Sequence, residues 1–172
     1  MDRDIYRGRI FTVREETHEL PNGHRETLDL VRHGGAAAVV AMDAQDRICL
    51  LRQYRVVVDE WLWEVPAGRR EPDEPPEATA RRELAEEAGL QAAQWEALGP
   101  ILPTPGFCDE RIHLYLAQGL APAPLAREPG EIIEVHWLTL AEAEAAIHAG
   151  ELTDGKTQCA LYRYRLWRSA AP

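Results

Sequence analysis

Three glutamates in one short segment of the chain have the spacing to bind a metal ion together. Glu83, Glu86 and Glu87 stand at positions i, i+3 and i+4, so in a helix their carboxylates fall on one face. Like charges at this spacing repel, and a hard cation such as Mg²⁺, which prefers oxygen ligands, would cancel the repulsion. The alternative is a solvated acidic face balanced by four nearby arginines: Arg69, Arg70, Arg81 and Arg82.

The residues around these glutamates predict the helix that carries them. The pair Pro75-Pro76 suits a first turn, and Gly89 can end the helix in the left-handed conformation after Ala88. Asp73 or Glu74 can cap the N–H groups of the first turn. An apolar stripe that can pack on a sheet consists of Ala80, Leu84 and Ala88.

The acidic segment is part of a longer pattern. Gly68 is followed by five residues, then Glu74, then seven residues, and then the run RELAEEAGL from Arg82 to Leu90. This pattern resembles the signature box of the Nudix hydrolases, which cleave a pyrophosphate linked to a nucleoside or similar group with Mg²⁺ or Mn²⁺. The resemblance extends over roughly Gly34 to Leu140.

The resemblance implies roles for individual residues. Two or three metal ions would be bound by four groups: the side chains of Glu83, Glu86 and Glu87 and the backbone carbonyl of Ala67. Glu86 can alternatively orient a water molecule. Arg82 would orient a box glutamate, Gly68 would let the loop backbone approach the ions, and Glu74 would support that loop.

Residues outside the box resemble the ADP-ribose pyrophosphatase branch of the family. Pro105 stands fifteen residues after Leu90 and begins the run PGFCDE, which contains Gly106 and Glu110. Upstream, LLRQYRVVVDEWLWEVPAG is similar to the strand that leads to the box in that branch. The resemblance implies that Arg55 lies near the diphosphate and Glu110 near the terminal ribose, and that the products are AMP and ribose 5-phosphate.

A water nucleophile needs a general base, and related enzymes supply it from a loop beyond the box. The Pro-rich segment APAPLAREPGE offers Glu128 and Glu131, while Glu134 falls in the next predicted strand. Glu131 is our first choice because it directly precedes that strand. The alternative for each of these glutamates is that it merely keeps the loop soluble.

Two other functions remain open. One is a Nudix hydrolase that acts on a GDP-sugar, a dinucleoside polyphosphate or a coenzyme A derivative. The other is a catalytically silent nucleotide sensor, against which the intact acidic set argues.

Length and composition indicate one compact domain, and the order of its predicted strands and helices argues for an α+β fold. The chain has 172 residues, 45% of them hydrophobic, and a formal charge of -10, which disfavours nucleic acid or an anionic membrane as a partner. Three cysteines without metal-ligand spacing and a start without a signal peptide predict a soluble, cytoplasmic protein.

Alternating patterns in the first half predict two hairpins. One joins IYRGRIFTVREE to HRETLDLVRH through a Pro-Asn-Gly turn, and the other joins AAAVVAMD to RICLLRQYRVVV. Further strands and two terminal helices predict a mixed sheet, which the resemblance makes a Nudix-type α/β/α sandwich. We expect residues 1–33 to form an antiparallel extension that makes a homodimer, with 34–172 as the Nudix domain. Arg25 and Arg32 would then reach substrate across the dimer.

Overall fold

The N-terminal strands form a sheet of their own in the computed structural model, which describes residues 2–127 and 129–170. Strands β1 (Arg3–Arg7), β2 (Phe11–Glu19) and β3 (Arg25–His33) pair in sequence order, all antiparallel. The predicted hairpin between β2 and β3 is confirmed, and its turn contains Gly23 with φ of 80°. The first predicted strand is divided by a turn between Gly8 and Phe11, in which the Gly8 N–H donates a hydrogen bond to the Phe11 carbonyl.

Two further sheets build the body of the molecule. One has the order β7 (Ala67–Arg69), β4 (Ala36–Ala41), β9 (Ile112–Pro122) and β8 (Leu90–Ile101), and the other has the order β10 (Ile133–Thr139), β5 (Arg47–Arg55) and β6 (Glu60–Glu64). Strands β4 and β9 run parallel while their other neighbours run antiparallel. The predicted mixed sheet is therefore confirmed.

The predicted hairpin between β4 and β5 forms only at its turn, where the Asp43 N–H bonds the Arg47 carbonyl and Met42 forms an isolated antiparallel bridge with Ile48. The predicted pairing of the two strands is wrong, because they belong to different sheets. Both edges of β4 are already occupied, one by β7 and the other by β9. Since a strand has only two hydrogen-bonding edges, β5 must pair elsewhere, and it lies between β10 and β6.

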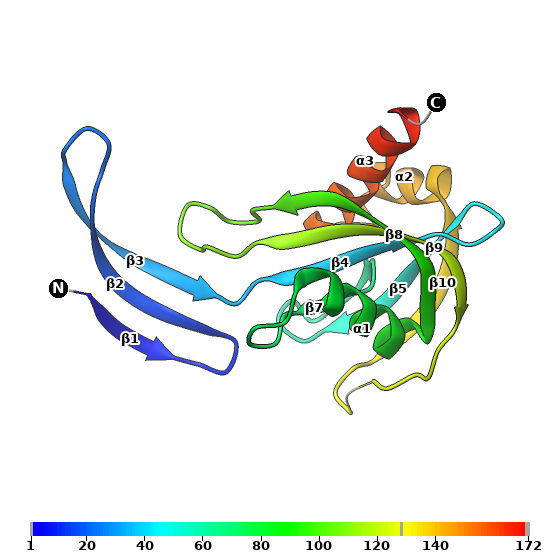
Figure 1. The fold of residues 1–172 in the computed structure, drawn as a ribbon, viewed down its shortest axis with the longest axis horizontal. Helices are drawn as coiled ribbons and strands as arrows, with labels where there is room; N and C mark the ends of the chain where they lie inside the picture. Colours follow the sequence, from blue (N-terminus) through cyan, green and yellow to red (C-terminus); the bar gives the residue numbers. More distant parts are fainter. Residues whose placement is uncertain (1, 128, 171–172) are drawn as a thin grey trace.

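Helices cover both faces of the four-stranded sheet. Alternate residues of β4 point to opposite sides: Ala36, Ala38 and Val40 pack with α3 (Gly155–Ala170), whereas Ala37, Val39 and Ala41 pack with α1 (Pro76–Ala88). Helix α2 (Leu140–His148) follows β10 and lies beside α3 (Figure 1). This arrangement confirms the α/β/α sandwich. Within the described part of the chain, no helix is long and apolar enough to cross a membrane.

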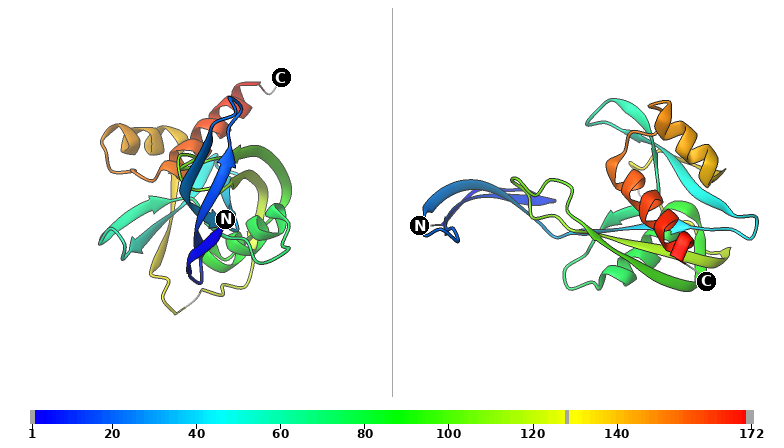
Figure 2. Two further views of the ribbon diagram at one scale, coloured as in Figure 1. Left: turned by 90° about the vertical axis from the view of Figure 1, so that its left-hand side faces the viewer. Right: turned by 90° about the horizontal axis from the view of Figure 1, so that it is seen from above.

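The N-terminal sheet projects from the body as an arm. Figures 1 and 2 show β1, β2 and β3 extending away from the helices, with β3 leading into β4. The arm meets the body at the loop between β8 and β9, where the Val31 N–H donates to the Phe107 carbonyl and the Asp109 N–H donates to the Val31 carbonyl. The loop that carries Pro105 and Glu110 is thus attached to the arm.

Candidate active site

Backbone conformation defines both ends of the acidic helix α1. Its N-cap is Pro75 in extended conformation, without a side-chain cap, so the predicted capping by Asp73 or Glu74 is wrong. The Glu74 carboxylate is engaged elsewhere, as described below. At the other end Gly89 adopts φ of 67°, and its N–H bonds to carbonyls of the last turn. The predicted left-handed termination is confirmed.

Strand β7 lies directly against the acidic face of α1. A β-carbon built on Gly68 would lie 2.0 Å from Oε1 of Glu83, closer than any real side chain could come. The Glu83 carboxylate is buried in this contact, and burial raises its pKa while Arg82 partly opposes the rise. Glycine at position 68 therefore makes the room that the Glu83 carboxylate occupies.

Glu87 is the most deeply buried of the three glutamates. The residue is 2% exposed, and its Oε2 accepts a hydrogen bond of 2.8 Å from the Ala67 N–H. The pKa of Glu87 is raised to about 8, mainly by burial and also by the charges of Glu83 and Glu131, against the opposing hydrogen bond from Ala67. A carboxylate in such a place needs positive charge nearby to ionise at neutral pH.

Arg82 holds the acidic face together. Its Nη1 donates to Glu83 Oε1 at 2.7 Å and to Glu86 Oε2 at 3.0 Å. Its Nε and Nη2 bond the two oxygens of Glu74, each at 3.0 Å, and Nη2 also bonds the Arg69 carbonyl. These bonds hold the pKa of Glu74 down at about 2. Arg82 thus joins the helix to the loop that precedes it.

The donor set fits a hard divalent cation. Glu83, Glu86 and Glu87 lie on one face beside the backbone of Ala67 and Gly68, and oxygen atoms are the ligands that Mg²⁺ and Mn²⁺ prefer. In residues 2–127 and 129–170 no three acidic, histidine or cysteine side chains already converge as a metal cluster. Two of the glutamates bond Arg82 and the third bonds Ala67, so cation binding would require these side chains to change partners.

A second group of charges surrounds Glu64, the last residue of β6. Arg55 binds Glu64 with both ends of its guanidinium, through Nε to Oε1 and Nη2 to Oε2, each at 2.7 Å. Lys156 also bonds Glu64, and it bonds Asp154 at 3.0 Å. The charge of Glu87 acts on Arg55. Arg55 is therefore fixed by Glu64 near the acidic helix, with its own side chain still partly exposed.

The loop after β9 brings Glu131 to the same place. Its charge raises the pKa of both Glu83 and Glu87, so the carboxylate lies within electrostatic range of the acidic face. Glu134 lies in β10, is exposed, and faces His136. Glu128, the other candidate base, lies outside the described residues.

The remaining predicted residues lie at the junction with the arm. Glu110 faces His33, whose Nδ1 is 3.4 Å from Glu110 Oε1. Pro105 lines a pocket of about 430 Å³ between β3 and the β8–β9 loop, and an added β-carbon on Gly106 would meet nothing within 4 Å. These three residues belong to one loop that contacts β3, whereas Arg55 and Glu131 are the ones that act electrostatically on Glu87.

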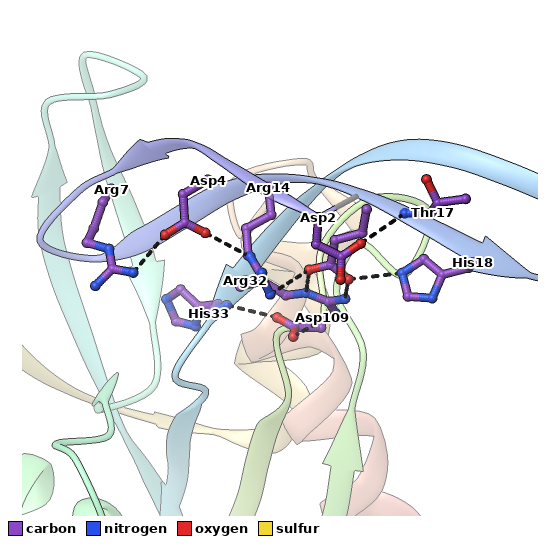
Figure 3. Close-up of polar contacts among 10 residues, drawn as sticks. Asp2, Asp4, Arg7, Arg14, Thr17, His18, Arg32, His33 and Asp109 are labelled. Carbon is purple, nitrogen blue, oxygen red and sulfur yellow. Dashed lines mark hydrogen bonds and ion pairs between the residues drawn. The ribbon is translucent and has the colours of Figure 1, made fainter.

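Arg32 is held in a network on the arm (Figure 3). It bonds Asp109 at 3.2 Å and the buried carboxylate of Glu16, which also pairs with Arg14 and His18. Arg32 is the main cause that lowers the pKa of Glu16 to about 2. Arg32 is therefore engaged within its own chain, and Arg25 is exposed on β3.

Comparison with known proteins agrees with this geometry. The NUDIX domain model matches residues 32–157 of the chain. The chain belongs to the Nudix family. Its Nudix box extends from β7 through the following loop and α1 to the first residue of β8, and contains Gly68, Glu74 and the run from Arg82 to Leu90.

Individual Nudix relatives cover nearly the whole chain. A methanol dehydrogenase activator of Bacillus methanolicus is 38% identical over 164 residues, which are 94% of this chain and 89% of the relative. An ADP-ribose pyrophosphatase of Mycobacterium tuberculosis is 39% identical over 153 residues, 87% and 74% of the two chains. A crystal structure of an ADP compounds hydrolase superposes with a TM-score of 0.82 at 25% identity, covering 97% and 91%.

Three residues next to the Nudix box were missed by the sequence reasoning. Glu64 is the one charged residue inside WLWEVP, and a charge in an apolar strand signals a buried partner. Glu64 has two such partners, Arg55 on β5 and Lys156 at the start of α3. Arg127 had no signal beyond its place in a polar loop, because its partners are backbone carbonyls, which no residue type marks, and that of Glu87 is 40 positions away.

Proposed function

We propose that this protein hydrolyses the pyrophosphate bond of ADP-ribose or a related ADP-sugar, with release of AMP and ribose 5-phosphate. The observation that carries the proposal is the burial of Glu83 and Glu87 against the backbone of Ala67 and Gly68. A binding module gains nothing from two buried carboxylates with raised pKa values, whereas a hydrolase of an anionic diphosphate needs a cation at that place. The branch within the family rests on the relative named as an ADP-ribose pyrophosphatase.

Metal binding is assigned to four groups: the side chains of Glu83, Glu86 and Glu87 and the carbonyl of Ala67. Two or three Mg²⁺ or Mn²⁺ ions bound there would neutralise diphosphate oxygens and lower the pKa of a bound water. Arg82 keeps Glu83 and Glu86 oriented through its own bonds to Glu74 and the Arg69 carbonyl. Glu86 can serve either as a metal ligand or to orient water.

Residues around the metal site would bind the substrate and deprotonate the attacking water. Arg55, held by Glu64, would bind the diphosphate with the guanidinium edge that Glu64 leaves exposed. Glu131 would accept the proton of the attacking water, because its charge lies close enough to act on the carboxylates of Glu83 and Glu87. Glu110, with Pro105 and Gly106 in the same loop, would bind the terminal ribose.

We assign residues 1–33 to an extension that forms a homodimer, and 34–172 to the Nudix domain. The arm exposes several large apolar side chains. A sheet of only three strands cannot bury them by itself, so they would be covered by packing against another surface. These side chains are Ile5, Tyr6, Ile10 and Phe11. Arg32 would have to leave Glu16 to reach a partner's substrate, so Arg25 is the better candidate across a dimer. We further propose a cytoplasmic location, with no nucleic acid or membrane partner.

The test is hydrolysis of ADP-ribose beside GDP-mannose, a diadenosine polyphosphate and NADH, each with Mg²⁺, Mn²⁺ or chelator. We expect metal-dependent release of AMP, fastest from ADP-ribose. Faster turnover of another substrate would assign a different nucleotide to the same centre. Tight nucleotide binding without turnover of any substrate would contradict the proposal and favour a sensor.

A further inference from the structure

The loop between β9 and β10 is attached to the C-terminal end of α1. The Ala123 N–H donates to the Gly89 carbonyl at 2.8 Å, and the Ala126 N–H donates to the Glu86 carbonyl at 3.3 Å. Leu125 packs against Gly89. The first part of the loop therefore uses carbonyl groups that the helix leaves free at its end.

Arg127 makes the strongest of these attachments. Its Nε and Nη2 donate to the Glu87 carbonyl at 2.9 and 2.7 Å, and its Nη1 donates to the Ile133 carbonyl at 2.6 Å. One guanidinium thus joins the last turn of α1 to the first residue of β10. Only a planar group with several donors can hold two carbonyls from different elements in this way.

The electrostatics of the helix end favour a cation at this place. The last turn of α1 carries no basic residue, so nothing on the helix itself complements the negative end of its dipole. Arg127 brings positive charge to that end from the loop. The attachment is therefore favoured by charge as well as by hydrogen bonds.

Arg127 and Ile133 mark the two ends of the segment that carries Glu131. Arg127 bonds the last turn of α1, and Ile133 packs in one cluster with Leu84 of α1, so both ends are held at this helix. The charge of Glu131 acts on Glu83 and Glu87. We propose that Arg127 is a positioning residue that holds Glu131 toward Glu83 and Glu87 by joining the Glu87 and Ile133 carbonyls. This inference rests on the proposed role of Glu131 as general base.

The kinetic test compares Arg127→Ala, Arg127→Lys and Glu131→Gln with the wild type on ADP-ribose. A misplaced base slows the chemical step without weakening substrate binding, so we expect kcat of Arg127→Ala to fall about 10- to 100-fold while KM changes by less than about threefold. Arg127→Lys should recover part of kcat, because an ammonium can bond one of the two carbonyls. The matched control is Arg165→Ala, which removes an exposed arginine of α3 that pairs with Glu144 of α2 at 3.2 Å.

A double variant separates positioning from a general structural effect. If Arg127 acts through Glu131, then Arg127→Ala should cost nothing more in kcat once Glu131→Gln is present. A full further loss in the double variant would overturn the inference. So would a wild-type kcat in Arg127→Ala when Glu131→Gln is inactive, and that result would leave the proposed function intact.

Amide hydrogen exchange tests the anchor without any substrate. Arg127→Ala should speed exchange at Ala123 and Ala126, whose N–H groups bond α1. Unchanged exchange would overturn the anchoring step even in a protein that failed to hydrolyse ADP-ribose. If Glu131→Gln keeps wild-type activity, both the base assignment and the inference fall, whereas the metal site does not.

Discussion

The carboxylate of Glu83 occupies the space that a side chain at position 68 would fill. A β-carbon on Gly68 would lie 2.0 Å from Oε1, 2.1 Å from Cδ and 2.5 Å from Oε2 of Glu83. Gly68 is not among the glycines with positive φ, so the backbone itself would accept alanine. The requirement for glycine therefore comes from the neighbouring carboxylate and not from the turn.

The substitution Gly68→Ala should displace the Glu83 carboxylate and lower kcat by about 100-fold, because a displaced ligand no longer holds its metal-binding position. The fold should persist, since the three atoms nearest to the added methyl group all belong to the carboxylate at the end of one side chain. Steady-state kinetics and thermal melting measure both effects. Gly155→Ala is the control, because an added β-carbon there meets nothing within 4 Å. A normal rate in Gly68→Ala would show that the Glu83 position is not needed.

Neutralising either buried glutamate should remove turnover and spare the fold. We expect Glu83→Gln and Glu87→Gln each to lower kcat by about 100-fold or more, beyond the 10- to 100-fold typical for a residue that only supports a ligand. In Glu87→Gln the amide oxygen can still accept from the Ala67 N–H, which maintains the local structure. Excess chelator should abolish wild-type activity. Near wild-type rates in either variant would remove the metal-site assignment.

Without metal, the stability of the protein should fall as pH rises toward 8. The pKa of Glu87 is about 8 in the folded state against an ordinary value of 4.5. Between these values the folded chain keeps a proton that the unfolded chain releases, so the free energy of unfolding decreases with rising pH. Urea titrations in chelator at pH 5 to 8 should show this decrease in the free energy of unfolding. The decrease should be smaller in the Glu87→Gln variant. Parallel pH profiles for the two proteins would contradict the raised pKa.

Arginine at position 55 should not be replaceable by lysine. Lysine offers a single charge and cannot bind both oxygens of Glu64 while presenting a free edge to a diphosphate. We expect Arg55→Lys to raise KM for ADP-ribose by about tenfold, since charge-assisted bidentate pairs are the stronger kind. Steady-state kinetics measure the change in KM, and isothermal titration calorimetry with AMP measures binding. An unchanged KM would place Arg55 outside the substrate site.

Local sequence signals predicted much of the structure because they act over short distances. Gly89 ends α1 by its own conformational freedom, and the spacing of Glu83, Glu86 and Glu87 sets their common face. Where the prediction failed, the side chain or strand edge in question binds a partner that is distant in sequence. Glu74 does not cap α1 because Arg82 binds its carboxylate, and β4 does not pair with β5 because β7 and β9 occupy its edges.

The sequence by itself determined the identity of the acidic helix, the box pattern and the family, since each depends on residue types at fixed spacing. The tertiary structure decided which groups meet those carboxylates. Arg127 reaches the Glu87 carbonyl across 40 positions, Lys156 reaches Glu64 across 92, and Arg32 reaches Asp109 across 77. Such contacts arise when sheets and helices pack, and periodicity along the chain carries no information about which distant elements will become neighbours.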